Sequence, residues 1–151
     1  MKNLTWCFCG RMALRTEMDM IASQVETYSD IMCIVPFVYM GSEVEGEPLG
    51  EAGLLAMHTK RINESTAVCV VIDEEADKID EIGNLTAIEI THCIDNDKPI
   101  YFNRVFPDLL YQLQKSGKVA GIEVVCIGQE NSPNVKLFRV LYKKETHSEE
   151  N

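Results

Sequence analysis

The sequence predicts an α/β domain with an open parallel sheet and extra strands at its C-terminal end. Strand-like apolar segments alternate with segments of helical periodicity over the first two-thirds of the chain, which is the pattern of consecutive βαβ units. The segment 67–73 is apolar until its final aspartate, as expected of a central parallel strand that is buried on both faces. Segments 119–127 and 135–142 are strand-like with no helix between them, so they pair as a hairpin at one edge or extend the sheet.

The N-terminal part begins with a strand, a turn and a helix. Residues 4–9 form the strand and residues 10–12 the turn. Residues 13–28 form the helix, because apolar side chains recur there at spacings of four, three and four residues. These apolar positions are Leu14, Met18, Ile21 and Val25. Residues 31–38 form the second strand, whose ladder ends at Pro36 because proline has no N–H to donate.

Two acidic loops and a series of shorter elements follow. Residues 40–50 are rich in glycine and glutamate, which predicts a flexible loop of the kind that acts as a lid. Residues 74–82 form the second acidic loop. The remaining elements are a helix at 51–63, a strand at 67–73, a helix at 86–95, a strand at 99–103 and a helix at 107–116. Pro107 and Gly117 mark the two ends of that last helix.

Length, composition and charge limit the class of protein. A chain of 151 residues is long enough for a proper core, and we assign residues 1–144 to one α/β domain and 145–151 to a disordered tail. The net charge of −10 argues against polymeric nucleic acid as a partner, because nucleic acid selects a basic face. The apolar runs have strand length, which predicts no membrane span. The first residues lack the features of a signal peptide, so we expect a cytoplasmic protein.

Six cysteines allow two interpretations. Five fall in predicted strands and Cys93 falls in a predicted helix, where a reduced cysteine packs as a small apolar side chain. The Cys7-x-Cys9 spacing is also compatible with a metal site, but no second Cys/His pair has the spacing of a zinc site. We therefore expect core cysteines, with no metal and no cofactor.

Two carboxylates fall where an α/β sheet binds ligands. Asp73 ends the apolar central strand, and ligands bind outside the carboxyl ends of such strands. Glu89 lies near the start of a short helix that follows Gly83, and helix N-termini favour anions. Two carboxylates at such a rim suit chemistry at a sugar carbon, where one attacks or stabilises the anomeric centre and the other moves a proton. Structural roles remain open, because Thr86 and Glu89 fit a capping box and Asp73 fits a cap of the next turn.

Two further side chains near this rim also have open roles. Arg11 follows Gly10 in the first turn and is able either to hold a phosphate bidentately or to pair with a nearby acid in solvent. His58 shares a helix face with Leu55 and Ile62, so it either contacts substrate or is a half-buried, hydrogen-bonded histidine. The first loop lacks the further glycines of a dinucleotide fingerprint and the Gly-Lys-Ser/Thr of a P-loop.

The order and spacing of several motifs resemble the nucleoside 2-deoxyribosyltransferase superfamily, and most closely its small bacterial and phage members. The similarity covers residues 4–103 and leaves 104–144 as a C-terminal extension. The similar segments are Cys9-Gly10, His58-Thr-Lys-Arg61-Ile62, the strand to Asp73, Ile82-Gly83-x-x-Thr86-x-x-Glu89-Ile90 and Lys98-Pro99-Ile100. The resemblance implies a flavodoxin-like or Rossmann-like open parallel sheet with helices on both faces. It also implies a homo-oligomer whose subunits complete each other's sites.

The resemblance further implies N-glycosidic bond chemistry on a nucleoside or nucleotide. Glu89 would be the nucleophile and Asp73 the strand-end acid of an N-glycosidase or deoxyribosyltransferase. The residues expected to contact the substrate are Gly10, Arg11, Met12, Pro36, His58, Gly83, Asn84 and Thr86. Attack by water on the glycosyl intermediate gives hydrolysis and attack by a second base gives transfer, and the sequence leaves both open.

The chain departs from these relatives at the rim, which leaves two other functions open. The relatives usually carry serine and threonine after the loop glycine and tyrosine before the Ile-Gly pair, where this chain has Arg11, Met12 and Glu81. These differences are compatible with a nucleotide-binding module that lacks catalysis. They are also compatible with an interaction protein that presents its C-terminal strands to a partner.

Overall fold

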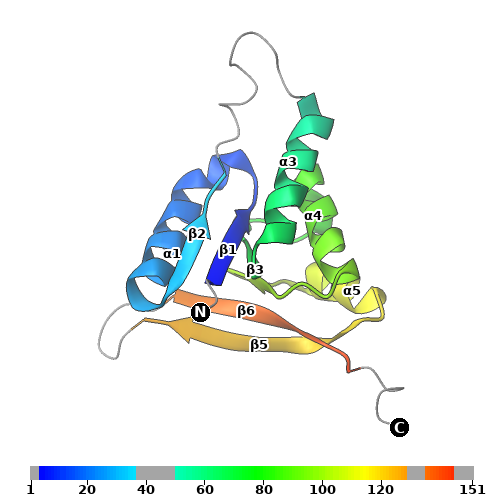
Figure 1. The fold of residues 1–151 in the computed structure, drawn as a ribbon. Helices are drawn as coiled ribbons and strands as arrows, with labels where there is room; N and C mark the ends of the chain where they lie inside the picture. The colour runs from blue at the N-terminus through cyan, green and yellow to red at the C-terminus, as the bar shows by residue number, and fades with distance from the viewer. Residues whose placement is uncertain (1–3, 37–49, 129–134, 145–151) are drawn as a thin grey trace, which may run out of the picture.

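A computed structural model describes residues 4–36, 50–128 and 135–144, and these contain six strands in one sheet. The strands are β1 (Leu4–Cys9), β2 (Ile31–Ile34), β3 (Ala67–Val70), β4 (Ile100–Phe102), β5 (Val119–Ile127) and β6 (Val135–Tyr142). Their order across the sheet is β2-β1-β3-β4-β6-β5 (Figure 1). β1 to β4 pair in parallel, and β6 pairs antiparallel with both β4 and β5. The predicted α/β fold with extra C-terminal strands is therefore confirmed.

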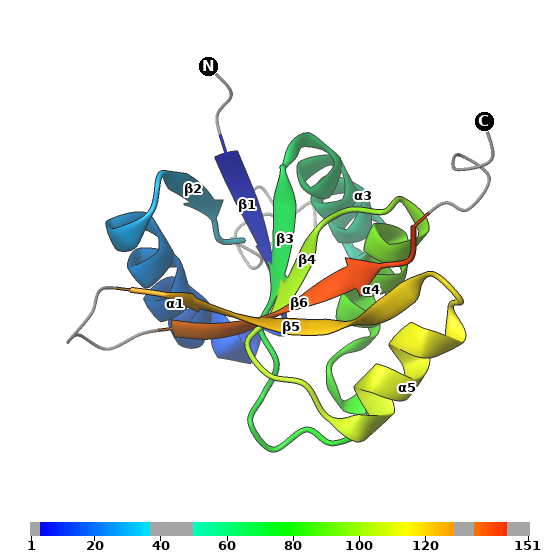
Figure 2. The same cartoon turned by 90° about the horizontal axis from the view of Figure 1, so that it is seen from below.

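Helices cover both faces of the sheet. They are α1 (Arg15–Tyr28), α3 (Gly50–Glu64), α4 (Asn84–Asp95) and α5 (Pro107–Lys115), with short 3-10 turns η1 (Met12–Leu14) and η3 (Ile79–Glu81). α1 lies on one face, and α3, α4 and α5 lie on the other (Figures 1 and 2). This is the layering of a flavodoxin-like or Rossmann-like open sheet.

Side chains that alternate along β1 divide the core into two halves. Trp6 and Phe8 pack with α1, whereas Cys7 and Cys9 pack beneath α3 and α4. All four side chains are buried. The division follows from the two-residue period of a strand, and burial on both faces explains why the central strands carry no alternating polar residues.

β3 is shorter than predicted, because a side chain takes the place of a neighbouring strand. It ends at Val70, not at residue 73. Val71 still donates its N–H to the Cys9 carbonyl at 2.8 Å. The Asn103 amide then accepts the Ile72 N–H at 2.7 Å and donates to the Ile72 carbonyl at 3.1 Å. The chain is thus held beside the sheet up to the rim although the regular ladder has ended.

Several other boundaries differ from the prediction by one to a few residues. α1 begins two residues later than predicted, the ends of α3 and β4 are each displaced by one residue, and α5 ends one residue earlier. β2 ends at Ile34, two residues before buried Pro36, whose missing N–H makes an early end reasonable. α4 begins at Asn84 and not at residue 86, because Gly83 provides the turn that starts it. The predicted strand residues 37–38, the acidic loop at 40–49 and the tail at 145–151 lie outside the described residues.

The two C-terminal strands form an antiparallel hairpin with the predicted bounds. β6 lies beside β4, with Tyr101 opposite Arg139. Seen from below, the hairpin crosses the molecule from α1 to α5 (Figure 2). Leu137 accordingly packs in the α1 half of the core and Val140 in the other half. The C-terminal extension therefore contributes to both halves of the core.

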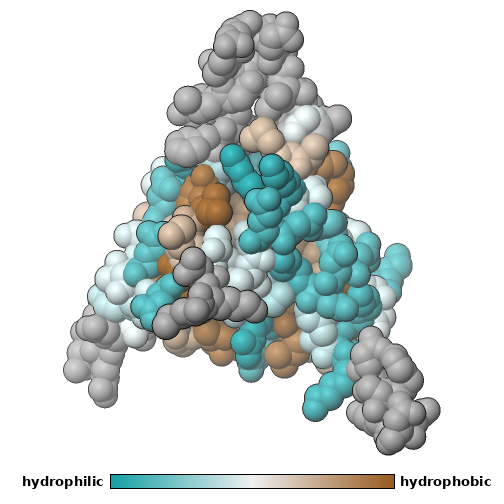
Figure 3. All heavy atoms as spheres, in the orientation of Figure 1, coloured by the Kyte–Doolittle hydropathy of each residue, from teal (hydrophilic) through white to brown (hydrophobic). Residues whose placement is uncertain are grey.

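The surface mixes polar and apolar side chains. Hydrophilic residues cover most of the face seen in Figure 3, and small hydrophobic areas remain between them. Among the helices of the described residues, none has both the length and the apolar character needed to cross a bilayer.

The cysteines lie in the predicted elements, and all six are free. Four are buried, namely Cys7, Cys9, Cys69 and Cys93, and Cys33 is half-buried. Cys126 is exposed, so the expectation of a core position is wrong for this residue, because it lies on β5 at the edge of the sheet. Within the described ranges, no group of three His, Cys, Asp or Glu side chains is arranged to hold a metal ion.

Candidate functional site

The candidate site lies between β1 and β3. From β1 the chain adds β2 on one side and then β3 on the other side, so the direction in which strands are added to the sheet reverses at this point. Open α/β sheets bind ligands outside the carboxyl ends of the strands at such a point. The loops that follow these two strands are in close contact at Gly10, where an added Cβ would lie 2.8 Å from the Val71 carbonyl oxygen and 2.8 Å from the Met18 side chain. Glycine is therefore required by space at this position.

An acidic cavity of about 260 Å³ opens at this rim. It is lined by Arg11, Asp73, Glu75, Ala76 and Glu81. Arg11 donates a weak hydrogen bond to the Glu81 carbonyl at 3.4 Å. The described lining carries three carboxylates and one guanidinium, so its charge favours a neutral or cationic group over a phosphate.

Gly83 closes the rim on the side of α4. Its φ of +99° is one that residues with a side chain rarely adopt. An added Cβ would also lie 3.0 Å from Cγ of Arg11. Gly83 thus brings the start of α4 into contact with the loop after β1, where the predicted substrate contacts Gly10 and Arg11 also lie.

Asp73 adopts the structural role that the sequence left open. Its carboxylate accepts the Glu75 N–H at 3.0 Å and so caps the turn that follows β3. Arg104 supports the same turn, because it donates to the carbonyls of Asp73 at 2.9 Å and of Ala76 at 2.5 Å. Asn103 and Arg104 were missed from the sequence, since Asn103 is the last residue of the predicted strand at 99–103 and Arg104 follows it directly.

Glu89 is buried, and the capping-box interpretation of it is wrong. Gly83 is the N-cap of α4 and makes no side-chain cap hydrogen bond. Thr86 therefore lies in the first turn, where its side chain is buried. Glu89 is one turn further on and is 4% exposed. Burial raises its pKa to about 7, although a hydrogen bond from the Cys9 thiol acts to lower this pKa.

His58 on α3 is the neighbour of this carboxylate. Its Nδ1 lies 3.5 Å from Oε2 of Glu89, and the residue is 7% exposed. Burial, and secondarily the charge of Arg61, lower the pKa of His58 below its ordinary value. Burial thus favours the neutral form of both partners, and the sequence had indicated a buried face for His58 through its spacing to Ile62.

The predicted site residues accordingly form two groups. Gly10, Arg11, Asp73 and Gly83 meet at the acidic rim, whereas Glu89 lies with His58 and Cys9 between β1, α3 and α4. Glu89 does not line the cavity that contains Asp73. The other predicted contacts are half-buried Met12, buried Pro36, exposed Asn84 and buried Thr86. These four lie after β1, after β2 and at the start of α4, all at the carboxyl edge of the parallel strands.

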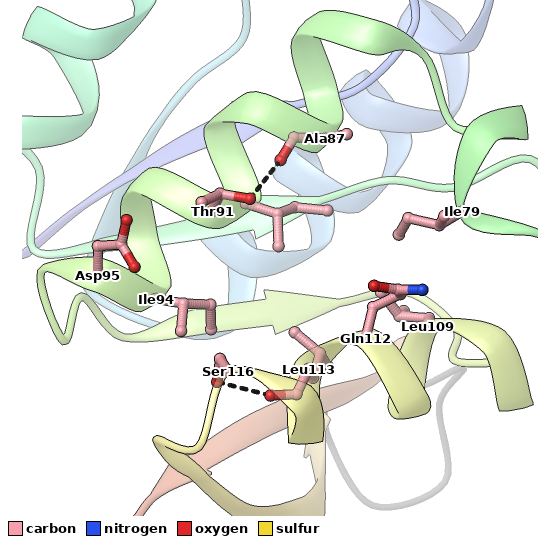
Figure 4. Close-up of a pocket in the computed structure, with 10 residues that line it drawn as sticks. Ile79, Ala87, Thr91, Ile94, Asp95, Leu109, Gln112, Leu113 and Ser116 are labelled. Atoms are coloured by element: carbon pink, nitrogen blue, oxygen red, sulfur yellow. Dashed lines mark hydrogen bonds between the residues drawn. The ribbon is translucent and has the colours of Figure 1, made fainter.

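A second cavity, of about 150 Å³, lies between α4 and α5 (Figure 4). Its walls are mainly apolar, with Ile79, Ile94 and Leu109 among them. The hydroxyls of Thr91 and Ser116 at its edges donate to carbonyls of their own helices. The lining also contains exposed Asp95 and half-buried Gln112. With mainly apolar walls and this one carboxylate, the groove is a weaker candidate for a reaction than the rim.

The chain was compared with protein-family models, with curated proteins and with solved structures, and no match was found in any of the three. The support for a function therefore comes from the fold and from the residues at the carboxyl edge of the sheet.

Proposed function

We propose that this protein breaks or transfers the N-glycosidic bond of a nucleoside or nucleotide, with Glu89 as the nucleophile. The observation that carries the proposal is the buried Glu89 carboxylate, held close to Cys9 at the end of β1 and to His58 on α3. A carboxylate without a capping role, next to the switch point of an α/β sheet, supports a role in chemistry more than one in local structure.

The reaction requires a carboxylate at the anomeric carbon. Positive charge develops on this carbon as its bond to the base breaks, and Glu89 would form a covalent glycosyl ester there. Water or a second base then displaces the ester and restores the free carboxylate. Because the pKa of Glu89 is raised to about 7, a large fraction of this group is ionised at pH 8, as a nucleophile must be.

The departing base needs a proton, and we assign the donor to the rim acids. Glu81 is a poor donor, because its carboxylate accepts the N–H groups of Asp77 and Lys78, and these hydrogen bonds lower its pKa. Among the other rim acids we propose Asp73, which follows β3, as the donor. This role requires its carboxylate to leave the Glu75 N–H that it now accepts.

Charge at the rim bears on the substrate. Arg11 is the basic residue of the rim cavity and shares it with Asp73, Glu75 and Glu81. A nucleoside would meet less repulsion there than a nucleotide, whose phosphate would be surrounded by carboxylates. We therefore expect nucleosides to be better substrates than their 5′-monophosphates.

Release of free base from ribonucleosides, 2′-deoxyribonucleosides and their 5′-monophosphates, measured by chromatography, tests the proposal. Wild type should release base from at least one substrate, and Glu89→Gln should be slower by at least about 10³-fold. Asp95→Asn is the matched control, because it removes an exposed carboxylate from the same helix. Equal rates for wild type and Glu89→Gln would contradict the nucleophile assignment.

A second candidate function is nucleotide or nucleoside binding without catalysis. It is favoured by the turn-capping hydrogen bond of Asp73 and by the separation of Glu89 from the cavity that contains Asp73. It predicts saturable ligand binding by calorimetry together with no product from any member of the panel. Base release at stoichiometric enzyme would reject it.

A further inference from the structure

The contact between His58 and Glu89 has unusual features for a structural pair. Both residues are buried, at 7% and 4% exposure, and among the described residues Nδ1 of His58 has no hydrogen-bond partner. Its distance of 3.5 Å to Oε2 of Glu89 exceeds the about 2.7–3.2 Å of a formed N–H···O hydrogen bond. A buried polar nitrogen without a partner costs free energy, so a purely structural explanation of this histidine is weak.

The surroundings of the pair offer few alternatives. The ionisable groups that interact with the pair are the thiols of Cys7 and Cys9 on β1 and of Cys93 on α4, and the cation Arg61, while the cation Lys98 acts on the thiols of Cys7 and Cys93. None of these cations is an acceptor. The only carboxylate recorded within ion-pair distance of His58 in the described residues is that of Glu89. The distance therefore identifies Glu89 Oε2 as the carboxylate acceptor that lies nearest to Nδ1.

We propose that His58 is a positioning residue for Glu89, whose Nδ1–H donates to Oε2 when the carboxylate is ionised. Hydrogen bonds of this kind are often long in a ligand-free site and shorten in the reacting complex. The bond would fix one carboxylate oxygen and direct the other towards the anomeric carbon. The positioning role rests on the proposed function, whereas the hydrogen bond itself does not.

The proposal requires a specific tautomer. For Nδ1 to donate, the neutral ring must carry its proton on Nδ1. The side chain of asparagine places an amide N–H close to the position of Nδ1, and that of glutamine places it close to the position of Nε2. Substitution with asparagine therefore keeps a donor at the required position, whereas substitution with glutamine keeps a polar side chain but moves its donor elsewhere.

The test follows the pKa of Glu89 by ¹³C NMR of its carboxyl carbon, with the resonance assigned by its loss in Glu89→Gln. In His58→Leu the pKa should rise by about one unit, because the ionised form loses a donor. It should stay at the wild-type value in His58→Asn and rise in His58→Gln. His92→Leu is the control, since His92 lies on α4 but pairs with Asn63, and it should leave the pKa unchanged.

An unchanged pKa in His58→Leu would overturn the proposal. If that variant does not fold, equal pKa values in the asparagine and glutamine variants would overturn it instead. In base release, His58→Leu should lose about tenfold in kcat with little change in KM, and His58→Asn should recover most of it. These experiments separate the two proposals, because a wild type that releases no base fails the proposed function while the NMR shift still tests the hydrogen bond.

Discussion

Replacing Glu89 with glutamine should stabilise the protein above neutral pH while removing its proposed nucleophile. Burial raises the pKa of this carboxyl from 4.5 to about 7, and the residue is 4% exposed, so water screens it little. Each pKa unit corresponds to about 1.36 kcal/mol. The difference of about 2.5 units therefore makes the ionised carboxylate cost up to about 3 kcal/mol in the folded state.

The sign of the effect follows from which state holds the proton more tightly. The folded pKa is higher than the unfolded one, so the protonated group favours the folded state. This contribution is fully present below about pH 4.5 and is lost as the pH rises to about 7. Glutamine is neutral at every pH, so the Glu89→Gln variant does not lose this stability as the pH rises. The lowered pKa of His58 affects the stability of wild type and variant alike, so its contribution cancels in the difference between their free energies of unfolding.

Urea unfolding of wild type and Glu89→Gln between pH 4 and pH 8 measures the effect. The two free energies of unfolding should be nearly equal at pH 4, and the variant should exceed wild type by up to about 3 kcal/mol at pH 8. Asp95→Asn, which removes an exposed carboxylate from the same helix, should show no comparable change with pH. A difference between wild type and Glu89→Gln that is the same at pH 4 and pH 8 would refute the reasoning.

Three further predictions follow from the site. The rate of base release should rise with pH through about 7 as Glu89 ionises, and a pH–rate profile that is flat from pH 5 to pH 8 would contradict this. Gly10→Ala should lower the free energy of unfolding by about 1–3 kcal/mol, because its Cβ would lie 2.8 Å from a backbone oxygen. Gly121→Ala, with no atom within 4 Å of its Cβ, is the control, and equal losses in urea unfolding would argue against the close approach. Asn103→Leu should cost about 1–3 kcal/mol by the same assay, since it removes both partners of the buried Ile72 backbone, and unchanged amide exchange at Ile72 would count against that role.

The fold was largely predictable because its signals are local. The bounds of β1, β5 and β6 agree with the sequence prediction, since each strand is a continuous apolar or alternating run between turn residues. The end of β3 was not predictable, because it depends on the Asn103 side chain from a different part of the chain. A tertiary hydrogen bond of this kind leaves no mark on the pattern of residues 67–73.

The site was predictable only where a strand end defines it. Gly10, Arg11 and Asp73 follow parallel strands, Gly83 precedes α4, and the four residues meet at the rim. The pairing of Glu89 with Asp73 in one cavity is not seen, because Glu89 lies on the buried side of α4. The sequence placed this helix two residues late, which turned a core position into an apparent capping position.

The observed start of α4 changes the role that can be assigned to Glu89. With Thr86 as the N-cap, the carboxylate would satisfy a backbone donor at the helix start, and its presence would be explained by local stability. With Gly83 as the N-cap, the same carboxyl group is buried beside a histidine nitrogen that has no hydrogen-bond partner in the described part of the chain. It destabilises the fold at any pH at which it is ionised. A leucine or glutamine would fill this space without that cost. A buried carboxyl group that opposes stability when it is ionised is the kind of residue found at functional sites, which is why Glu89, and not Asp73, is the residue on which the proposed chemistry depends.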